Sequence, residues 1–322
     1  MHYLHTDDSH TLVLSQTDKP IIGDDECLIK VQAIGINRAD LLQKAGKYPP
    51  PPGESDILGI EVSGEIVEVG KKVNDWQISG RVFALVPGGG YAEYAKVKAS
   101  HLMALPKTMS VEQGAAIAET FLTAYQSLFA LAKLQPKERV LIHAGASGVG
   151  CAAIQLAKAA GCFVTTTVGS DEKVKACRKL GADEVLNYQQ QDFTVWAKQH
   201  RCQFDVIIDV VAGEYVAKNI DVAALDGRIV TLAILGGRFS QHFDMAKMLG
   251  KRLSLYASTL RNRSDDYKAN LVTNFNRDFG GKLSDETLQP VIDSVMPWQE
   301  ANLAHQKMAN NRNIGKLVLR VN

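Results

Sequence analysis

The sequence predicts an α/β protein in which a doubly wound parallel sheet is flanked by mainly β segments from both ends of the chain. Between residues 119 and 262, short β-branched and apolar runs alternate with stretches at helical spacing, which is the pattern of βαβ units. Residues 1–118 instead hold short runs that alternate apolar and polar positions, as half-buried strands do. The 322 residues suffice for about two domains, and we expect the tail, 263–322, to return to the first of them.

The first domain is predicted to be mainly β, with clear strand patterns at 27–31 and 64–69. The prolines at 49–52 force an irregular loop, because each ring fixes φ and removes a hydrogen-bond donor. The glycines at 88–90 predict a turn leading into 91–94, which we expect to be an edge strand.

In the middle of the chain, the spacing of apolar residues alternates between that of strands and that of helices. A strand at 140–143, a glycine-rich turn and a helix at 149–160 are followed by a strand at 163–168 and a helix at 172–180. Further strands are predicted at 184–186, 206–210 and 228–232. The tail predicts helices at 265–277 and 299–308 and a strand at 316–319.

Composition excludes several classes of function. The chain has 36 Lys and Arg and 35 Asp and Glu, which leaves a net charge of +1. This balance gives no electrostatic attraction to nucleic acid or to an anionic membrane. No apolar run reaches the ~20 residues of a membrane-spanning helix, and the first ten residues lack a signal-peptide core. The five cysteines are widely spaced without a CxxC pair, which disfavours disulfides. We therefore expect a cytoplasmic protein.

The turn at 145–150, Gly-Ala-Ser-Gly-Val-Gly, joins the first strand of the α/β part to its first helix. Gly145 would allow a tight turn, Gly148 would let a pyrophosphate approach the backbone, and Gly150 would let the helix pack closely. The helix N-terminus then offers free N–H groups to phosphates. This context predicts a dinucleotide site with Gly145, Ser147, Gly148 and Val149 as contacts; the alternative is a structural turn without a ligand.

The second strand indicates which dinucleotide binds. It ends Thr167-Val168-Gly169-Ser170, without the acidic residue that usually binds the ribose of NAD. Ser170 and Lys173 could instead bind a 2′-phosphate, and charge-assisted bonds of roughly 1.5–3 kcal/mol each would favour NADPH by about a hundredfold. Asp171 and Glu172 would repel that phosphate if they pointed inward; we interpret them as acids that complement the helix dipole.

No metal site is predicted. Asn37-Arg38 stands where a zinc alcohol dehydrogenase would need a cysteine, and Gly59-Ile60-Glu61 lacks a metal-binding histidine. We interpret His143, beside the glycine turn, as a packed strand residue. Because no nucleophile elbow is present either, the cofactor must carry the chemistry.

These residues resemble a known family, the zinc-free quinone oxidoreductase (zeta-crystallin-like) branch of the medium-chain dehydrogenase/reductases, and most resemble its tumour-suppressor-inducible members. The segments that carry the resemblance are GINRAD (35–40), GKYP (46–49), ILGIE (57–61), GGGYA (88–92), IHAGASGVG (142–150), LDGR (225–228) and NIGK (313–316). The resemblance implies a GroES-like partial β-barrel catalytic domain built from both chain ends and a Rossmann domain that binds NADPH. It also implies a homodimer, with 252–256 as the last Rossmann strand and a pairing edge.

The resemblance also implies roles for single residues. Gly148 and Val149 would touch the pyrophosphate, and Tyr188 would cover the adenine ribose or its phosphate. Gly169, Ser170 and Lys173 would contact the 2′-phosphate. Thr123 would lie near the nicotinamide, and Asn311 would reach the cofactor from the tail of the chain.

Tyr48 and Asn37 are the candidates at the substrate face. Tyr48 could stack on a flat quinone and donate to its oxygen; the alternative is a loop tyrosine packed on the proline run. Asn37 could donate too, or could brace the backbone.

The function expected is zinc-independent, NADPH-dependent reduction of a quinone or another small electrophile by hydride transfer. A side-chain donor would stabilise the charge that develops on the acceptor oxygen. One alternative is reduction of the activated double bond of an enone or enoyl thioester. Another is an NADPH-binding protein without catalytic activity.

Overall fold

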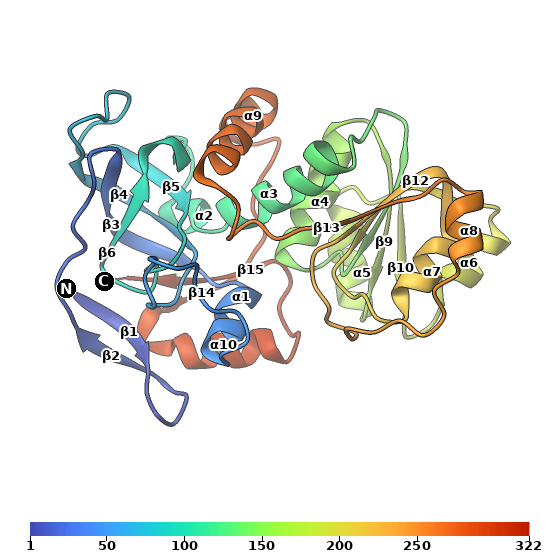
Figure 1. The fold of residues 1–322 in the computed structure, drawn as a ribbon, viewed down its shortest axis with the longest axis horizontal. Helices are drawn as coiled ribbons and strands as arrows, with labels where there is room; N and C mark the ends of the chain where they lie inside the picture. Colours follow the sequence, from blue (N-terminus) through green and yellow to red (C-terminus); the bar gives the residue numbers. More distant parts are fainter. Residues whose placement is uncertain (322) are drawn as a thin grey trace. The chain divides into compact units, whose positions relative to one another are not determined.

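The chain divides into two compact units in the computed structural model, which describes residues 1–321. Unit 1 combines 1–122 with 260–322, and unit 2 is 123–259. The sequence analysis placed its boundaries at 118/119 and 262/263. Blue strands from the start of the chain and red ones from its end lie in the same unit in Figure 1.

A seven-stranded sheet organises unit 1, in the order β14-β15-β3-β4-β5-β7, with β6 also paired to β3. β14 and β15 run parallel, whereas β15 pairs antiparallel with β3, so the tail completes a sheet begun near the N-terminus. β1 and β2 form a separate hairpin. The strands are β1 (His2–Thr6), β2 (Leu12–Gln16), β3 (Glu26–Gly35), β4 (Glu61–Val69), β5 (Arg81–Leu85), β6 (Tyr94–Lys98), β7 (Leu102–Ala104), β14 (Ile292–Pro297) and β15 (Lys316–Arg320).

Helices join and cover these strands. They are α1 (Arg38–Lys44), η1 (Ala99–His101), α2 (Val111–Gly114), α9 (Asp265–Ser284), η3 (Trp298–Glu300) and α10 (Ala301–Ala309), while α3 (Ala118–Tyr125) crosses the division between the units. α9 continues past the predicted end at 277 although Gly280 and Gly281 disfavour a helix. Phe279 and Leu283 are buried beyond that point, so packing outweighs local propensity.

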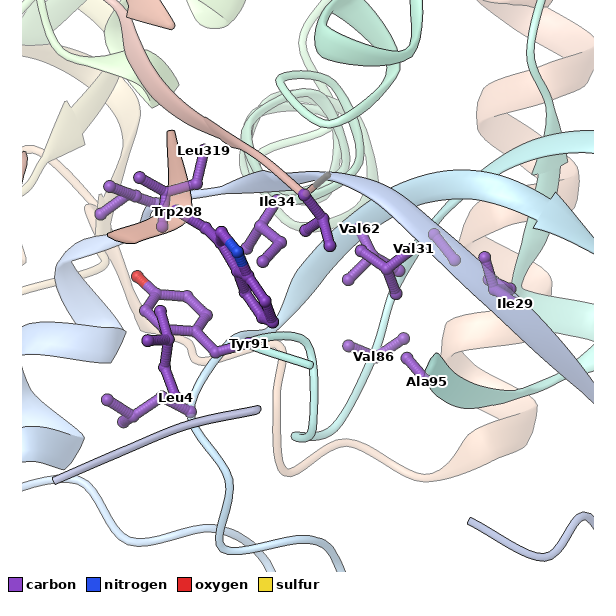
Figure 2. Packing of buried hydrophobic residues seen from close by; sticks show 14 of the residues in the cluster. Leu4, Ile29, Val31, Ile34, Val62, Val86, Tyr91, Ala95, Trp298 and Leu319 are labelled. Atoms are coloured by element: carbon purple, nitrogen blue, oxygen red, sulfur yellow. The ribbon is translucent and has the colours of Figure 1, made fainter. Parts of the chain in front are cut away.

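The core of unit 1 gathers side chains from both chain ends, including Leu4, Val31 and Val62 with Trp298. Figure 2 shows Tyr91 within this cluster, with its hydroxyl oxygen pointing away from Val86 and Ala95. The prediction of an edge strand at 91–94 was therefore wrong in its start: β6 begins at Tyr94, and the Tyr91 side chain is fully buried. Burial of this ring against distant segments is a tertiary effect that alternation along the chain does not reveal.

Unit 2 is a six-stranded, all-parallel sheet in the order β10-β9-β8-β11-β12-β13. This is the doubly wound order, and the predicted α/β class is confirmed. The elements are η2, a π-helix (Gln126–Leu131), β8 (Arg139–His143), α4 (Gly148–Ala159), β9 (Phe163–Val168), α5 (Asp171–Lys179), β10 (Glu184–Asn187), α6 (Phe193–Gln199), β11 (Phe204–Asp209), α7 (Tyr215–Val222), β12 (Ala223–Thr231), α8 (Met245–Gly250) and β13 (Ser254–Ala257).

The structure also bears on the expectations about disulfides and membrane-spanning helices. All five cysteines are buried and free, so no disulfide forms between them. Across residues 1–321, no helix combines the length and the apolar character that crossing a bilayer requires.

Candidate cofactor and substrate sites

The glycine turn follows β8 and leads into α4, as predicted, but Gly145 acts differently from expectation. The left-handed residue is Ala144, with φ of 54°, rather than Gly145. A Cβ on Gly145 would lie 1.9 Å from Oγ1 of Thr166 on β9. Gly145 is therefore required because the turn presses against the neighbouring strand, and not because of its own φ.

The start of α4 is preorganised for an anion. Ser147 is its N-cap, and Oγ accepts a 3.0 Å hydrogen bond from the N–H of Gly150. A Cβ on Gly150 would lie 2.4 Å from the carbonyl oxygen of Ala144, so the turn and the helix start are held together. Gly148 and Val149 are partly exposed between these anchors. The turn is thus a cradle of backbone N–H groups at a helix N-terminus.

The ends of β9 and β10 bring a second group of predicted residues together. The N–H of Tyr188 donates to the carbonyl of Val168, and a Cβ on Gly169 would lie 2.3 Å from the Tyr188 hydroxyl oxygen. Ser170 caps α5 by accepting from the N–H of Lys173 at 3.4 Å. Because β8, β9 and β10 are adjacent and parallel, this group lies on the same sheet edge as the glycine turn.

The two acids after Ser170 begin α5, as the dipole interpretation predicts. One Asp171 carboxylate oxygen accepts hydrogen bonds from Asn187 at 2.8 Å and from Gln190 at 3.2 Å. This carboxylate therefore ties the helix start to the end of β10. Glu172 is exposed.

Two other residues near the sheet have defined surroundings. Thr123 is half-buried in the last turn of α3, and its carbonyl accepts a 2.7 Å hydrogen bond from Ser127 in η2. His143 is buried between hydrogen bonds to Thr167 and Asn219, and burial lowers its pKa, so it stays neutral. His143 is a packed strand residue, as interpreted from the sequence.

In unit 1, Asn37 is the N-cap of α1 within a buried polar network. Its Nδ2 donates to the carbonyl of Gly35 and to Oε2 of Glu61, each at 3.1 Å. Its Oδ1 accepts from Nζ of Lys316 at 2.6 Å. The side chain is 5% exposed and fully engaged, which favours the bracing alternative for Asn37.

Lys316 and Glu61 form the buried ion pair of this network, with Nζ 2.7 Å from Oε2. Lys316 also donates to the carbonyl of Ile36, while Oε1 of Glu61 accepts from the N–H of Glu119. The pair joins the start of β15 to the start of β4, 255 residues apart. The Lys316 ammonium group already binds the carboxylate oxygen that a metal ion would need as a ligand, so the residues here do not fit a zinc ion.

Tyr48 lies in the loop after α1 and contacts an arginine that the sequence analysis did not select. The guanidinium carbon of Arg261 is 5.5 Å from the centre of the Tyr48 ring, and Nη1 donates to the Tyr48 carbonyl at 3.4 Å. Nε of Arg261 donates to the carbonyl of Pro87 at 2.8 Å. Its Nη2 is buried and has no hydrogen-bond partner within residues 1–321.

Burial raises the pKa of Tyr48, while the charge of Arg261 opposes that rise and Glu119 adds to it. The phenol therefore remains a hydrogen-bond donor at neutral pH. The cation over its ring would stabilise negative charge on an oxygen atom that bound beside this loop.

Asn311 follows α10 in a left-handed conformation with φ of 53°. Its Oδ1 accepts a 2.7 Å hydrogen bond from Nη2 of Arg38, the residue next to Asn37. The structure thus brings Asn311 to the start of α1. Among residues 1–321, no cluster of three His, Cys, Asp or Glu side chains is placed to bind a metal.

Sequence reasoning missed Arg261, Lys316 and Asp40. Asp40 had a local signal, because Asn37 and Asp40 have the spacing of a capping box, which they form. Lys316 and Arg261 had none, because their partners lie far away in the sequence.

Comparison with known proteins places the chain in a family. The family model "Alcohol dehydrogenase GroES-like domain" matches residues 23–107, and the model "Zinc-binding dehydrogenase" matches residues 148–277. Human quinone oxidoreductase is 30% identical over 308 residues, covering 93% of this chain and 90% of that protein. This chain is a medium-chain dehydrogenase/reductase. The predicted GroES-like domain and the predicted family are both confirmed.

Solved structures of other medium-chain dehydrogenase/reductases share its fold over almost the whole chain. Escherichia coli quinone oxidoreductase complexed with NADPH is 25% identical, with a TM-score of 0.87 and coverage of 99% of this chain and 98% of that one. CurK enoyl reductase is 27% identical, also with a TM-score of 0.87, covering 100% of this chain and 99% of that one. These relatives support oxidoreductase chemistry with a nicotinamide cofactor.

Proposed function

We propose that this protein is a zinc-independent reductase that uses NADPH to reduce quinones. The observation that carries the proposal is the edge formed by β8, β9 and β10, where a phosphate cradle stands beside Ser170 and Lys173. β9 ends without the acid typical of NAD sites. The likeness to quinone oxidoreductases supports the choice of acceptor.

The residues present fit the cofactor. Gly145 leaves no room for a Cβ, and the turn it forms presents backbone N–H groups to a pyrophosphate. Ser170 and Lys173 would hold the 2′-phosphate, with Tyr188 over Gly169 beside them. Thr123 and Asn311 remain proposed contacts for the nicotinamide end. NADPH, when bound, supplies the hydride.

On the substrate side, the chain binds and polarises the acceptor. Tyr48 would donate a hydrogen bond to the quinone oxygen, and the buried guanidinium of Arg261 would stabilise the developing negative charge. Asn37 would hold the start of α1 in place through Lys316 and Glu61. No Lewis acid is needed, because quinones accept electrons readily.

Steady-state kinetics test this function. We expect kcat/KM with 1,2-naphthoquinone to be about a hundredfold higher with NADPH than with NADH. Protein treated with a chelator and shown by elemental analysis to hold no zinc should retain that activity. A kcat/KM with NADH equal to or above that with NADPH would refute the cofactor assignment. Loss of activity when zinc is removed would refute metal independence.

A second candidate is reduction of an enoyl thioester. The CurK likeness favours it, because that enoyl reductase matches this chain from end to end. The same assay distinguishes the two functions: a kcat/KM for crotonyl-CoA above that for every quinone tested would select the double-bond reductase.

Replacing Lys173 with alanine is expected to weaken NADPH binding about tenfold or more, because one charge-assisted contact to the 2′-phosphate is lost. NADH binding should stay nearly unchanged. Fluorescence titration with both cofactors measures the difference. Lys175→Ala is the matched control, since Lys175 is exposed two residues along the same helix and points elsewhere. A similar loss for both cofactors would contradict the assigned role.

We also propose a cytoplasmic homodimer that pairs through β13, the edge strand of the six-stranded sheet. Exposed apolar side chains in the segment between β12 and β13 support pairing: Ile234, Leu235, Phe239, Met245 and Leu249. Sedimentation equilibrium should give twice the monomer mass, and Leu249→Asp should shift the protein toward monomer. A wild-type monomer at micromolar concentration would exclude this assembly. Cell fractionation tests the location.

A further inference from the structure

Three buried side chains form a hydrogen-bonded chain across the core of unit 1. The Tyr91 hydroxyl lies 3.2 Å from Oδ2 of Asp40 and 2.8 Å from Nε2 of His305. All three residues are less than 5% exposed. The chain joins α1 to α10 through the segment before β6.

Neither end of this chain is paired by a hydrogen bond within residues 1–321. Oδ1 of Asp40 and Nδ1 of His305 are buried without a hydrogen-bond partner within residues 1–321. Unpartnered buried polar atoms are costly, so a purely structural cluster would be expected to satisfy them. The inner atoms are paired, because Oδ2 also accepts from the N–H of Asn37 at 2.8 Å.

The surroundings decide which member changes charge. Asp40 faces Lys316 of β15, Arg261 ahead of α9 and the Tyr91 hydroxyl, yet burial raises its pKa to about 6. His305 faces Lys44 of α1 and Tyr91, and burial lowers its pKa to about 3. Burial and the nearby Asp40 raise the pKa of Tyr91 well above its usual value. Near neutral pH, only Asp40 changes its charge, whereas Tyr91 and His305 stay neutral.

The Asp40 end lies next to the proposed substrate side. Asn37 begins the same helix turn, and Arg261, which acts on Asp40 electrostatically, covers the Tyr48 ring. The His305 end belongs to α10, beside Lys44. One end thus adjoins residues selected for the acceptor, whereas the other adjoins Lys44, one helical turn further along α1.

We propose that Asp40, Tyr91 and His305 form a proton relay that supplies the acceptor oxygen during the reduction. The proposal rests on the proposed reductase function, since a quinone that receives a hydride must also take up one proton to become a hydroquinone. It goes beyond that function by naming the path of the proton.

The transfer balances in protons and charge. The Oδ1–H bond of Asp40 breaks as the proton moves to the oxyanion, directly or through one water molecule. Tyr91 then passes its proton to Oδ2 of Asp40, and the Nε2–H of His305 replaces it. Nδ1 of His305 takes a proton from a water molecule, which leaves as hydroxide. Rotation of the three groups resets the relay.

Comparing the first turnover with later ones tests the relay. At about pH 6, where half of Asp40 holds its proton, Tyr91→Phe and His305→Gln should keep a first-turnover rate within about twofold of wild type. Both variants should lower kcat at least about tenfold, because reloading of Asp40 is impaired. Asp40→Asn should slow the first turnover itself. Stopped-flow absorbance of NADPH with 1,2-naphthoquinone measures both phases.

Ser63→Ala is the control, because it removes another buried hydroxyl of unit 1. This hydroxyl, on β4, donates to the carbonyl of Val82 at 3.0 Å. The variant should leave the ratio of first-turnover rate to kcat unchanged. If first turnover and kcat fall together in Tyr91→Phe and His305→Gln, or if neither falls, the relay is refuted.

A measurement without substrate separates this proposal from the proposed function. In the protein alone, ¹⁵N NMR shifts of the His305 ring should follow the titration of Asp40 in wild type and lose that response in Tyr91→Phe. An inactive protein with this coupling would refute the reductase but keep the proton path. An active protein without it would refute the relay alone.

Discussion

Replacement of Lys316 by methionine is expected to lower the free energy of unfolding by about 3–5 kcal/mol. The Lys316 side chain is 4% exposed and its ammonium group donates to three acceptors, so its removal leaves the fully buried carboxylate of Glu61 without a counter-charge. Such a charge cannot be rehydrated without disrupting the sheet that β15, β3 and β4 form. Urea denaturation at pH 7 measures the loss.

The double variant Glu61→Gln/Lys316→Met separates charge pairing from the hydrogen bonds of the ammonium group, because methionine keeps a stem of similar length. With both charges gone, the glutamine can still accept from the N–H of Glu119 and contact Asn37. Its stability should return to within about 1–2 kcal/mol of wild type. If the double variant is as unstable as Lys316→Met, the stabilisation comes from the hydrogen bonds of the ammonium group to Ile36 and Asn37 and not from charge pairing.

The second large effect is a change in the pH dependence of stability in Asp40→Asn. The pKa of Asp40 in the folded protein is about 6, above its ordinary value of 3.8, because the carboxyl is fully buried. Between these values the folded state holds a proton that the unfolded state has lost. The contribution of Asp40 to wild-type stability therefore falls as pH rises from about 4 to 6, by about 3 kcal/mol.

Asparagine has no such proton, so the stability of Asp40→Asn relative to wild type should rise by about 3 kcal/mol between pH 3 and pH 7. Denaturant unfolding of both proteins across that range measures it. Asp226 provides the opposite case: it is exposed, and its hydrogen bond to Arg252 lowers its pKa. Asp226→Asn should therefore lose stability relative to wild type as pH rises. A flat difference for Asp40→Asn would mean that the pKa of the buried carboxyl is the same in the folded and the unfolded state.

The predictable parts of the candidate site lie in short segments at strand ends. The turn at 145–150 and the segment 169–173 each follow a strand, and the bounds of β9 match the prediction, 163–168. Parallel strands bring such ends to one edge, so local patterns suffice to place these residues together. Their roles toward a cofactor stay predictions.

The substrate side was much less predictable. Tyr48 was selected from its loop, but its partner Arg261 is 213 residues away. Likewise, the Tyr91 side chain meets His305 across 214 residues. No periodicity or spacing connects positions so far apart.

The sequence by itself determined the α/β class, the parallel sheet and the glycine turn, because hydrophobic period and turn chemistry are local properties of the chain. The tertiary structure alone decided that Ala144 takes the left-handed conformation while Gly145 is pressed against Thr166. It also decided that Lys316 neutralises Glu61. Close packing between distant segments sets these features, and Lys316 and Glu61 become partners only when the sheet assembles.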